Sequence, residues 1–381
     1  MGCFVAGLQA QARSIQVRLD SLLQDPLLER SQLGLLVYDL TADSVLYSRG
    51  ARQTLRPAST MKLLTAVTAI DLLGSNYQFR TTLSYSGTVK DSVLTGDIYC
   101  VGNMDPMFDA DDMEAFANSI RGLGVDTIRG RFIEDRSFKE SDLLGEGWCW
   151  DDDNPQLSPL LVSRKDELLS TLIDRLRGSG IVVEAECSTG SIPKGKLTLS
   201  LSTRSHSLRD VLYPMLKESD NLFAEAVFYQ IAASMGVRPA KAAHARQLIK
   251  KEISKAGVSG IMYKIADGSG LSLYNYVTPE LMVSLLRYAY QNSHIYMHLF
   301  SSLPIAGRDG TLKKRMTGPL TNGKVRAKTG TLTGISSLAG YCLPPNGHTL
   351  AFCIINQGVM KNQEGRDFQD RICTELCKNI E

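Results

Sequence analysis

The sequence lacks several features that would each indicate a particular class of protein. No apolar run approaches the roughly 20 residues that a membrane-spanning helix needs. The formal net charge is only +2, so nothing in the charge balance indicates nucleic-acid binding. None of the eight cysteines forms a Cys-x-x-Cys pair, which argues against zinc, and we expect neither a metal nor a cofactor.

What remains is an ordinary globular composition. The chain has 381 residues, of which 43% are hydrophobic and 22% are charged. This length allows one large domain with an insertion, or two to three domains. Near the start, the apolar run 4–8 leads into Ala10-Gln11-Ala12, a small-x-small cleavage pattern. We therefore predict that residues 1–12 are the remnant of a secretory signal, with a frayed terminus as the alternative.

Strand patterns lie near both ends of the chain, and helical patterns lie between them. Alternating apolar residues predict strands at 33–40, 44–48, 324–327, 336–343 and 349–356. Helical spacing predicts helices at 165–177, 208–217, 222–235, 240–256 and 368–380. We therefore expect an α+β or α/β fold, with a sheet built from both ends and a helical subdomain beside it. Residues 76–160 are predicted to form an inserted α+β domain, and 13–75 and 161–381 to form the catalytic domain.

The stretch 56–70 carries the first chemical signal. Pro57 ends an extended run, and apolar residues then recur at helical spacing until Gly74. Ser59 and Lys62 are three residues apart, so they share one face of the helix start. A serine needs a neighbouring base to act as a nucleophile, and a lysine amine with a lowered pKa can be that base. A helix start also supplies N–H groups for an oxyanion.

Ser-x-x-Lys alone is a weak pattern, because the chain holds a second copy at Ser191-Ile192-Pro193-Lys194. Pro193 and the following Gly195 favour a turn there instead of a buried helix. We therefore assign no catalytic role to this second copy.

Two further motifs follow later in the chain. Ser219-Asp220-Asn221 lies between two helical patterns, although it is also a plausible helix cap. The stretch 328–331, Lys-Thr-Gly-Thr, ends a strand-like run. Together with Ser59 and Lys62, these motifs are far more specific than any of them alone, and the set is typical of penicillin-binding proteins and class A β-lactamases.

The chemistry of acyl transfer gives each motif a task. Ser219 is expected to relay a proton to the leaving amine, and Asn221 to orient the substrate amide and Lys62. Lys328 supplies a second cation, and Thr329 a hydroxyl, for a substrate carboxylate. The N–H groups of Ser59 and Thr331 are predicted to form an oxyanion hole, with Gly330 between the two binding residues on the strand.

Beyond the motifs, five longer stretches carry a resemblance to one family: 95–106, 217–225, 267–272, 303–312 and 325–334. The sequence resembles the class C low-molecular-mass penicillin-binding proteins, D-Ala-D-Ala carboxypeptidases and endopeptidases of peptidase family S13, from about Leu33 to Gln357. The resemblance implies a serine β-lactamase/transpeptidase-like fold with an antiparallel sheet. It also implies peptidoglycan stem peptides as substrates, acylation by β-lactams such as penicillins, and a periplasmic or cell-envelope location.

Some alternatives stay open at this stage. A β-lactamase on the same fold is less favoured, since the Glu-x-x-Leu-Asn setting of the deacylating glutamate is absent. The other alternative is a catalytically inactive envelope scaffold. Asp142 is a secondary candidate for contacting the cationic end of a stem peptide, with a solvated loop aspartate as the simpler interpretation. Leu273 stands where many relatives have a basic residue, which leaves the third-residue preference open.

Overall fold

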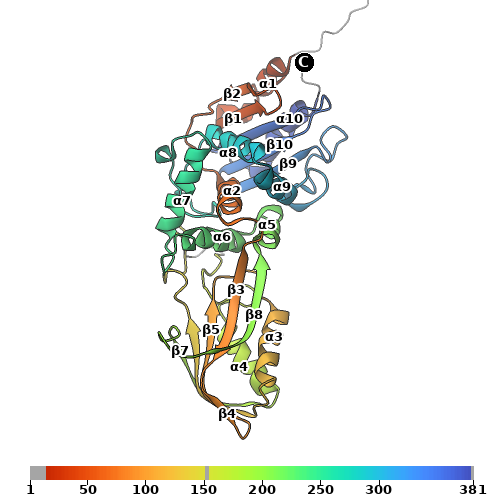
Figure 1. Ribbon diagram of the computed structural model, residues 1–381. Helices are drawn as coiled ribbons and strands as arrows, with labels where there is room; N and C mark the ends of the chain where they lie inside the picture. Colours follow the sequence, from red (N-terminus) through yellow and green to blue (C-terminus); the bar gives the residue numbers. More distant parts are fainter. Residues whose placement is uncertain (1–13, 151–153, 379–381) are drawn as a thin grey trace, which may run out of the picture.

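Two bodies lie end to end in this computed structural model, which describes residues 14–150 and 154–378 (Figure 1). The body drawn at the top contains both ends of the described chain, and the lower body is an insertion. The upper body holds all three sequence motifs.

The sheet of the upper body is built from both ends of the chain, as the sequence predicted. Its order is β2-β1-β11-β10-β9, and every neighbouring pair is antiparallel. The strands are β1 (Gln32–Asp39), β2 (Ser44–Arg49), β9 (Val325–Leu332), β10 (Ile335–Cys342) and β11 (Leu350–Gln357). All eight residues of β10 are buried, which explains its unbroken apolar and small-residue pattern.

Helices cover both faces of this sheet. On one face, α1 (Ile15–Leu22) and α10 (Asn362–Leu376) share a buried apolar cluster with β1, β10 and β11. On the other face, α8 (Pro279–Gln291) and α2 (Lys62–Leu73) do the same. The predicted fold, an antiparallel sheet flanked by helices, is confirmed.

The helical subdomain lies beside α2. It contains α5 (Leu208–Lys217), α6 (Asn221–Ala233), α7 (Ala242–Lys255) and α9 (Ser293–Ser302). Every residue of α2 from its first to Ile70 is buried, so this helix is surrounded by protein. Within the described ranges, this body also has four short 3₁₀ turns: η1 (Pro26–Glu29), η2 (Ala58–Met61), η3 (Gly260–Met262) and η4 (Gly310–Leu312).

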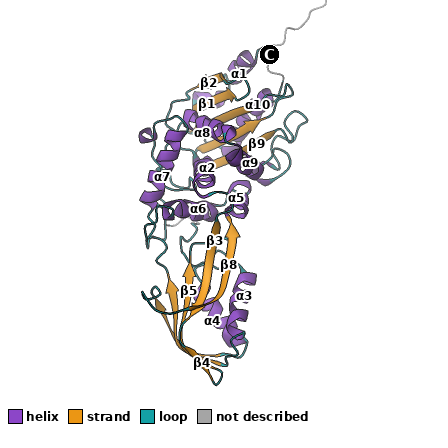
Figure 2. Cartoon of the chain, viewed as in Figure 1, coloured by secondary structure: helices purple, strands orange, loops and turns teal. Residues whose placement is uncertain are grey.

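The inserted body is a mixed sheet with helices on one face (Figure 2). Its strand order is β7-β6-β5-β3-β8, and the short strand β4 pairs with the first residues of β5. The elements are β3 (Gln78–Tyr85), β4 (Thr88–Lys90), β5 (Val93–Gly102), α3 (Ala110–Arg121), β6 (Thr127–Asp135), α4 (Leu168–Gly178), β7 (Val182–Thr189) and β8 (Leu199–Ser207).

The boundary predicted at residue 160 is wrong. The sheet of the insertion continues to Ser207, because β8 pairs with β3 in a register that runs from Gln78–Ser207 to Tyr85–Leu199. The helix expected at 165–177 for the catalytic domain is α4, which packs in the core of the insertion. The chain thus enters and leaves the insertion on adjacent antiparallel strands. The two edge strands, β7 and β8, are largely exposed and carry many polar residues. Their pairing with β6 and β3 therefore gave no strong signal in the sequence.

The predicted signal remnant at 1–12 lies outside the described residues. Among the residues that are described, none of the helices combines the length and the apolar character that crossing a membrane requires.

The core of the insertion can be tested at Phe116. Its ring is fully buried on α3 and stacks edge-to-face on Phe108, with 5.1 Å between ring centroids. We predict that Phe116→Ala lowers the free energy of unfolding by about 3–5 kcal/mol, through lost burial and the cavity left behind. Urea unfolding measures this loss, with the exposed Asn118→Ala on the same helix as a control expected to change it by about 0.5 kcal/mol or less. A loss of less than about 1 kcal/mol for Phe116→Ala would contradict the packing described here.

Candidate active site

Ser59 lies in the tight turn η2, immediately before α2. The Ser337 hydroxyl of β10 donates to the Pro57 carbonyl at 2.6 Å, and the Thr60 hydroxyl donates to the same oxygen at 2.7 Å. Ala58 has a φ of +47°, an uncommon value for a residue with a side chain. The turn is therefore held by hydrogen bonds against local strain, which fixes the position of the Ser59 hydroxyl.

Lys62 has three polar partners within hydrogen-bond reach. Its Nζ lies 3.0 Å from Ser59 Oγ, 2.7 Å from Asn221 Oδ1 and 2.8 Å from the carbonyl oxygen of Ser269. The last two partners are oxygens that can only accept. A neutral Lys62 amine has two N–H groups for these two acceptors and one lone pair for the Ser59 proton. The geometry thus suits a base directed at Ser59.

Burial lowers the pKa of Lys62 to about 8, from an ordinary value near 10.5. The side chain is fully buried, and removal from water disfavours its charged form. The nearby carboxyl groups of Asp267, Glu225 and Asp220 oppose this effect and keep the pKa from falling further. A substantial fraction of the amine is therefore neutral just above neutral pH.

The Ser219-Asp220-Asn221 motif forms the tight connection between α5 and α6. Ser219 has a φ of +64°, and the Asp220 side chain caps α6 by accepting from the Phe223 N–H at 3.2 Å. The helix-cap interpretation is therefore correct, but it does not exclude a chemical role. Capping fixes the connection that presents Ser219, while Asn221 reaches Lys62 from the first turn of α6.

Two ion pairs hold this connection from outside. Lys217, which is almost fully buried, pairs with Asp309 at 2.6 Å, and Arg164 pairs with Asp220 at 2.5 Å. Asp309 lies in the loop before η4 and Arg164 in the insertion, so two distant segments support the strained residue at 219. Neither residue was singled out from the sequence, because an isolated charge gives no sign of its partner.

Lys328 reaches the same cluster from β9. Its Nζ donates to Ser219 Oγ and to the Thr329 carbonyl oxygen, both at 2.8 Å. Burial, followed by the repulsion of nearby Lys62, holds the pKa of Lys328 well below its usual range. The two amines thus lie in one buried cluster, and burial is the main cause of the lowered pKa at both.

Gly330 allows β9 to lie directly against the Ser59 turn. A Cβ atom at this position would lie 2.1 Å from Ser337 Oγ and 3.0 Å from the Ser59 nitrogen, so any side chain would force the strand away. Thr331 follows on the same strand. An oxyanion hole made by the N–H groups of Ser59 and Thr331 requires the strand of Thr331 to run beside Ser59, and this close approach meets that requirement.

The loop 267–272, for which the sequence motifs predicted no role, forms the back of the site. Gly270 has a φ of +80°, and a Cβ atom there would lie 1.9 Å from the Ala58 oxygen. The Ser269 carbonyl faces Lys62, and the Gly268 carbonyl accepts from the Thr65 hydroxyl at 2.7 Å. This loop therefore joins the two ends of the first turn of α2.

Two buried carboxyl groups hold that loop. Glu225, one turn after Asn221 on α6, accepts from the Gly268 and Ser269 N–H groups at 3.1 and 2.7 Å. Asp267 accepts from the N–H groups of Gly270 and Ser272 and from the Asn275 amide, and it accepts from the Trp148 indole at 2.8 Å. Burial, with the charge of Asp267, raises the pKa of Glu225 to about 8.

The remaining sequence candidates lie elsewhere. Asp142 is exposed and lines a cavity of about 410 Å³ that also reaches Glu225 and Asp267 from behind the site. The second Ser-x-x-Lys copy lies in the connection between β7 and β8, where Ser191 is exposed. The part of the chain that the structure describes contains no cluster of three or more metal-ligating side chains.

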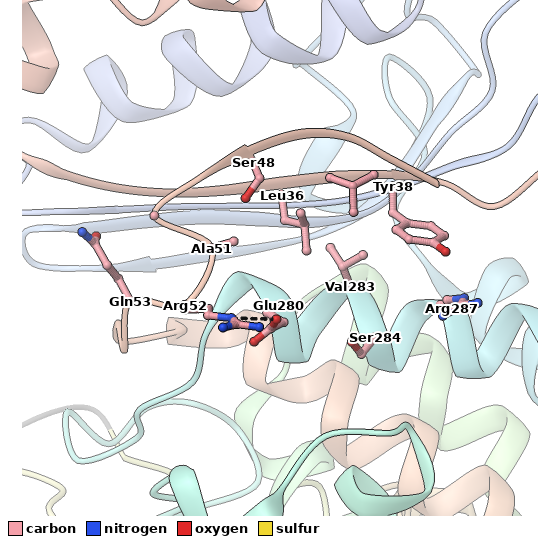
Figure 3. Close-up of a pocket in the computed structure, with 12 residues that line it drawn as sticks. Leu36, Tyr38, Ser48, Ala51, Arg52, Gln53, Glu280, Val283, Ser284 and Arg287 are labelled. Atoms are coloured by element: carbon pink, nitrogen blue, oxygen red, sulfur yellow. Dashed lines mark hydrogen bonds and ion pairs between the residues drawn. The ribbon is translucent and has the colours of Figure 1, made fainter. Parts of the chain in front are cut away.

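A groove of about 690 Å³ lies between β1, β2 and α8, away from the motifs (Figure 3). Its rim carries the Arg52–Glu280 ion pair at 3.1 Å, and none of the motif residues lines it. A second cavity, of about 680 Å³, is lined by Asn221 and Asp220 together with Arg164 and other residues of the insertion. Of these two cavities, the second is the one lined by Asn221, which contacts Lys62.

Comparisons with known proteins indicate one family. A model of the D-Ala-D-Ala carboxypeptidase 3 (S13) family matches residues 15–167 and 160–378. The D-alanyl-D-alanine carboxypeptidase of Actinomadura sp. (strain R39) is 28% identical over a 448-residue alignment that covers 92% of this chain and 82% of that protein. The D-alanyl-D-alanine carboxypeptidase DacB of Haemophilus influenzae is 25% identical, and the match covers 85% of each chain.

The fold also matches solved structures. The crystal structure of penicillin binding protein 4 (dacB) from Haemophilus influenzae superposes with a TM-score of 0.87 at 24% identity, covering 95% of this chain and 99% of that one. Another structure of that protein is a complex with a β-lactam. The TLA-3 extended-spectrum β-lactamase superposes less closely, with a TM-score of 0.51 at 15% identity.

Glu225 offers a test of how the loop behind the site is held. We predict that Glu225→Ala lowers the free energy of unfolding by about 2–4 kcal/mol, because two buried N–H groups lose their acceptor. Glu225→Gln keeps an acceptor and resembles the protonated carboxyl, so it should cost less near pH 6.

The pH dependence of the stability of Glu225→Gln tests whether the pKa of Glu225 is raised in the folded protein. Because the pKa of Glu225 is raised in the folded protein, the wild-type contribution declines as pH rises from about 4.5 to about 8. The stability of Glu225→Gln relative to wild type should therefore improve across this range in urea titrations. A relative stability that stays constant across this range would show that Glu225 is buried as a carboxylate instead.

Proposed function

The chain belongs to the D-Ala-D-Ala carboxypeptidase 3 (S13) family, and from this membership we propose that it cleaves peptidoglycan stem peptides through an acyl-enzyme on Ser59. The family predicted from the sequence is confirmed, and the protein is a serine-type D-Ala-D-Ala carboxypeptidase of the penicillin-binding class. DD-endopeptidase activity is the related reaction, since it breaks the bond after the same D-alanine with a different leaving amine.

One observation carries the assignment of Ser59 and Lys62. The Lys62 amine is fully buried, lies 3.0 Å from Ser59 Oγ, and has two other partners that can only accept. This arrangement supports proton transfer from Ser59 to Lys62 as the serine attacks the carbonyl carbon. An inactive scaffold has no physical need for a desolvated amine held in this way.

The other motif residues fit the steps that follow. The N–H groups of Ser59 and Thr331 stabilise the oxyanion of the tetrahedral intermediate. Ser219, bonded to Lys328, passes a proton to the nitrogen of the leaving D-alanine as the peptide bond breaks. Asn221 keeps Lys62 in place and orients the substrate amide, while Thr329 binds the terminal carboxylate. Water then hydrolyses the ester to release the shortened peptide and restore Ser59.

Substrate chemistry also supports a location. Peptides that end in D-Ala-D-Ala belong to the bacterial cell wall, so we infer that the protein acts in the periplasm or cell envelope. The related Haemophilus influenzae protein has been crystallised with a β-lactam. We infer that penicillins acylate Ser59 here as well, because they carry a reactive amide and a carboxylate.

The assignment is tested directly by substitution of the two central residues. Ser59→Ala should abolish both release of D-alanine from a pentapeptide and covalent labelling by fluorescent penicillin. Lys62→Ala should reduce both rates by about 10²–10⁴-fold, the usual range for loss of a general base. Ser191→Ala, in the second Ser-x-x-Lys copy, is the matched control and should retain full activity.

Mass spectrometry of the labelled protein separates the remaining outcomes. Any adduct on the Ser59→Ala protein would contradict the assignment of the nucleophile. Rapid turnover of penicillin by the wild type would instead indicate a β-lactamase, and the absence of both adduct and cleavage would indicate a scaffold. Cleavage of a crosslinked muropeptide in the same assay would establish the endopeptidase activity.

The rate of acylation should also depend on pH in a particular direction. Only neutral Lys62 can accept the Ser59 proton, and its pKa is lowered to about 8. The second-order rate constant for penicillin acylation should therefore rise about tenfold per pH unit between pH 5 and 7, and level off above about pH 8. Stopped-flow fluorescence from pH 5 to 9.5 measures this profile, and a flat profile over pH 6–9 would exclude Lys62 as the base.

A further inference from the structure

One face of β9 presents hydroxyl groups beside the catalytic cluster. Thr329 and Thr331 pair with Leu338 and Ser336 on β10, and paired residues in a sheet share a face. Leu338 packs in the cluster of α10, and Ser336 accepts from Gln369 of α10 at 3.0 Å. The side chains of Thr329 and Thr331 therefore lie on the α10 side of the sheet.

Two further side chains extend this row of donors. The Thr329 hydroxyl donates to Thr311 Oγ1 of η4 at 2.8 Å. At the other end, Nη2 of Arg366 on α10 lies 3.5 Å from Thr331 Oγ1. The row thus combines side chains from three separate parts of the chain: Thr311 of η4, Thr329 and Thr331 of β9, and Arg366 of α10.

Arg366 is held in place by close packing of α10. A Cβ atom at the preceding Gly365 would lie 2.8 Å from Ser336 Cβ, so the helix touches β10 at this point. The carbonyl oxygen of Arg366 accepts from Arg315 at 3.2 Å. The helix therefore brings the guanidinium to β9 at a fixed place in the fold.

The charge of Arg366 is available for a ligand. Among the described residues it forms no ion pair, whereas Arg315 pairs with Asp370 and Arg371 pairs with Asp25. The planar fork of a guanidinium suits a carboxylate. Arg366 is half-buried, which makes an unpaired charge there more costly than at the surface.

Lys328 is poorly suited to supply that charge by itself. It is fully buried, and its Nζ already donates to Ser219 and to the Thr329 carbonyl. Burial and the neighbouring Lys62 also hold the pKa of Lys328 well below its usual range. A substrate anion beside Thr329 therefore needs a more reliable cation. Arg366 of α10 lies next to Thr331, which is two residues further along the same face of β9.

We propose that Arg366 recognises the free C-terminal carboxylate of the peptide and, with Thr329 and Thr331, selects substrates that end in an acid. This inference rests on the proposed function. Thr329 and Thr331 are two residues apart on the strand, which separates them by roughly 7 Å. A carboxylate group that accepts one hydrogen bond from each threonine hydroxyl spans this distance. Arg366 is thus a specificity-determining residue and takes no part in proton transfer.

The test compares two substrates that differ only at their end. One is a stem-peptide analogue that ends in D-Ala-D-Ala with a free carboxylate, and the other is its C-terminal carboxamide. We expect Arg366→Gln to lower kcat/KM for the acid by about tenfold to a hundredfold, as for loss of a charge-assisted hydrogen bond. The carboxamide should change less than twofold, because it carries no charge for Arg366 to recognise.

Arg371→Gln is the matched control, since it removes the same charge from the same helix but lies at a residue paired with Asp25. It should leave both substrates unchanged. Arg366→Lys, which keeps the charge without the fork, should recover part of the preference for the acid. In the wild type, raising ionic strength should reduce kcat/KM for the acid more than for the carboxamide, and Arg366→Gln should remove this difference.

The possible failures are distinguishable. If wild-type protein releases no D-alanine from the acid and forms no penicillin adduct, the proposed function fails. If the wild type is active and Arg366→Gln leaves the acid-to-carboxamide ratio unchanged, the assignment of Arg366 is overturned. Equal losses for both substrates would overturn it as well, because they would indicate a structural role.

Discussion

The site depends on one physical constraint, which is that the Lys62 amine must be kept out of water while its hydrogen bonds remain satisfied. Burial lowers the pKa of this amine to about 8, and the oxygens of Asn221 and Ser269 accept its N–H groups. Without those acceptors, a buried polar group would destabilise the fold. The stability of α2, which begins at Lys62, therefore depends on two other segments that supply these acceptors: the start of α6 and the loop 267–272.

Local strain appears where this cluster is assembled. Ala58 and Ser219 both have positive φ values, although neither is a glycine. Such conformations persist when the surrounding structure determines them, and they are common at active sites. Here the supports are the Ser337 hydroxyl, which binds the turn before Ser59, and the Lys217–Asp309 ion pair beside Ser219. Glycines at 270 and 330 remove the side chains that would keep the loop and the strand apart.

The insertion shows where sequence patterns were insufficient. An inserted α+β domain was predicted from residue 76, but its end was placed near residue 160 instead of after Ser207. The pairing of β3 with β8 joins residues more than 100 positions apart, and neither strand is strongly apolar throughout. Long-range pairing of half-exposed strands depends on which partners the tertiary fold brings together, so local periodicity carries little information about it.

By itself, the sequence determined the sheet built from both chain ends, the helix after Ser59 and the three motifs, because these follow from short-range spacing and apolar periodicity. Only the tertiary structure decided which charges and polar groups meet. It placed Glu225 and Asp267 behind Lys62, Thr311 beside Thr329, and Arg366 near Thr331. The contacts of Glu225, Thr311 and Arg366 each join separate segments. A side chain carries its charge in the sequence, but its partner, its burial and hence its pKa are set by the packing of other elements.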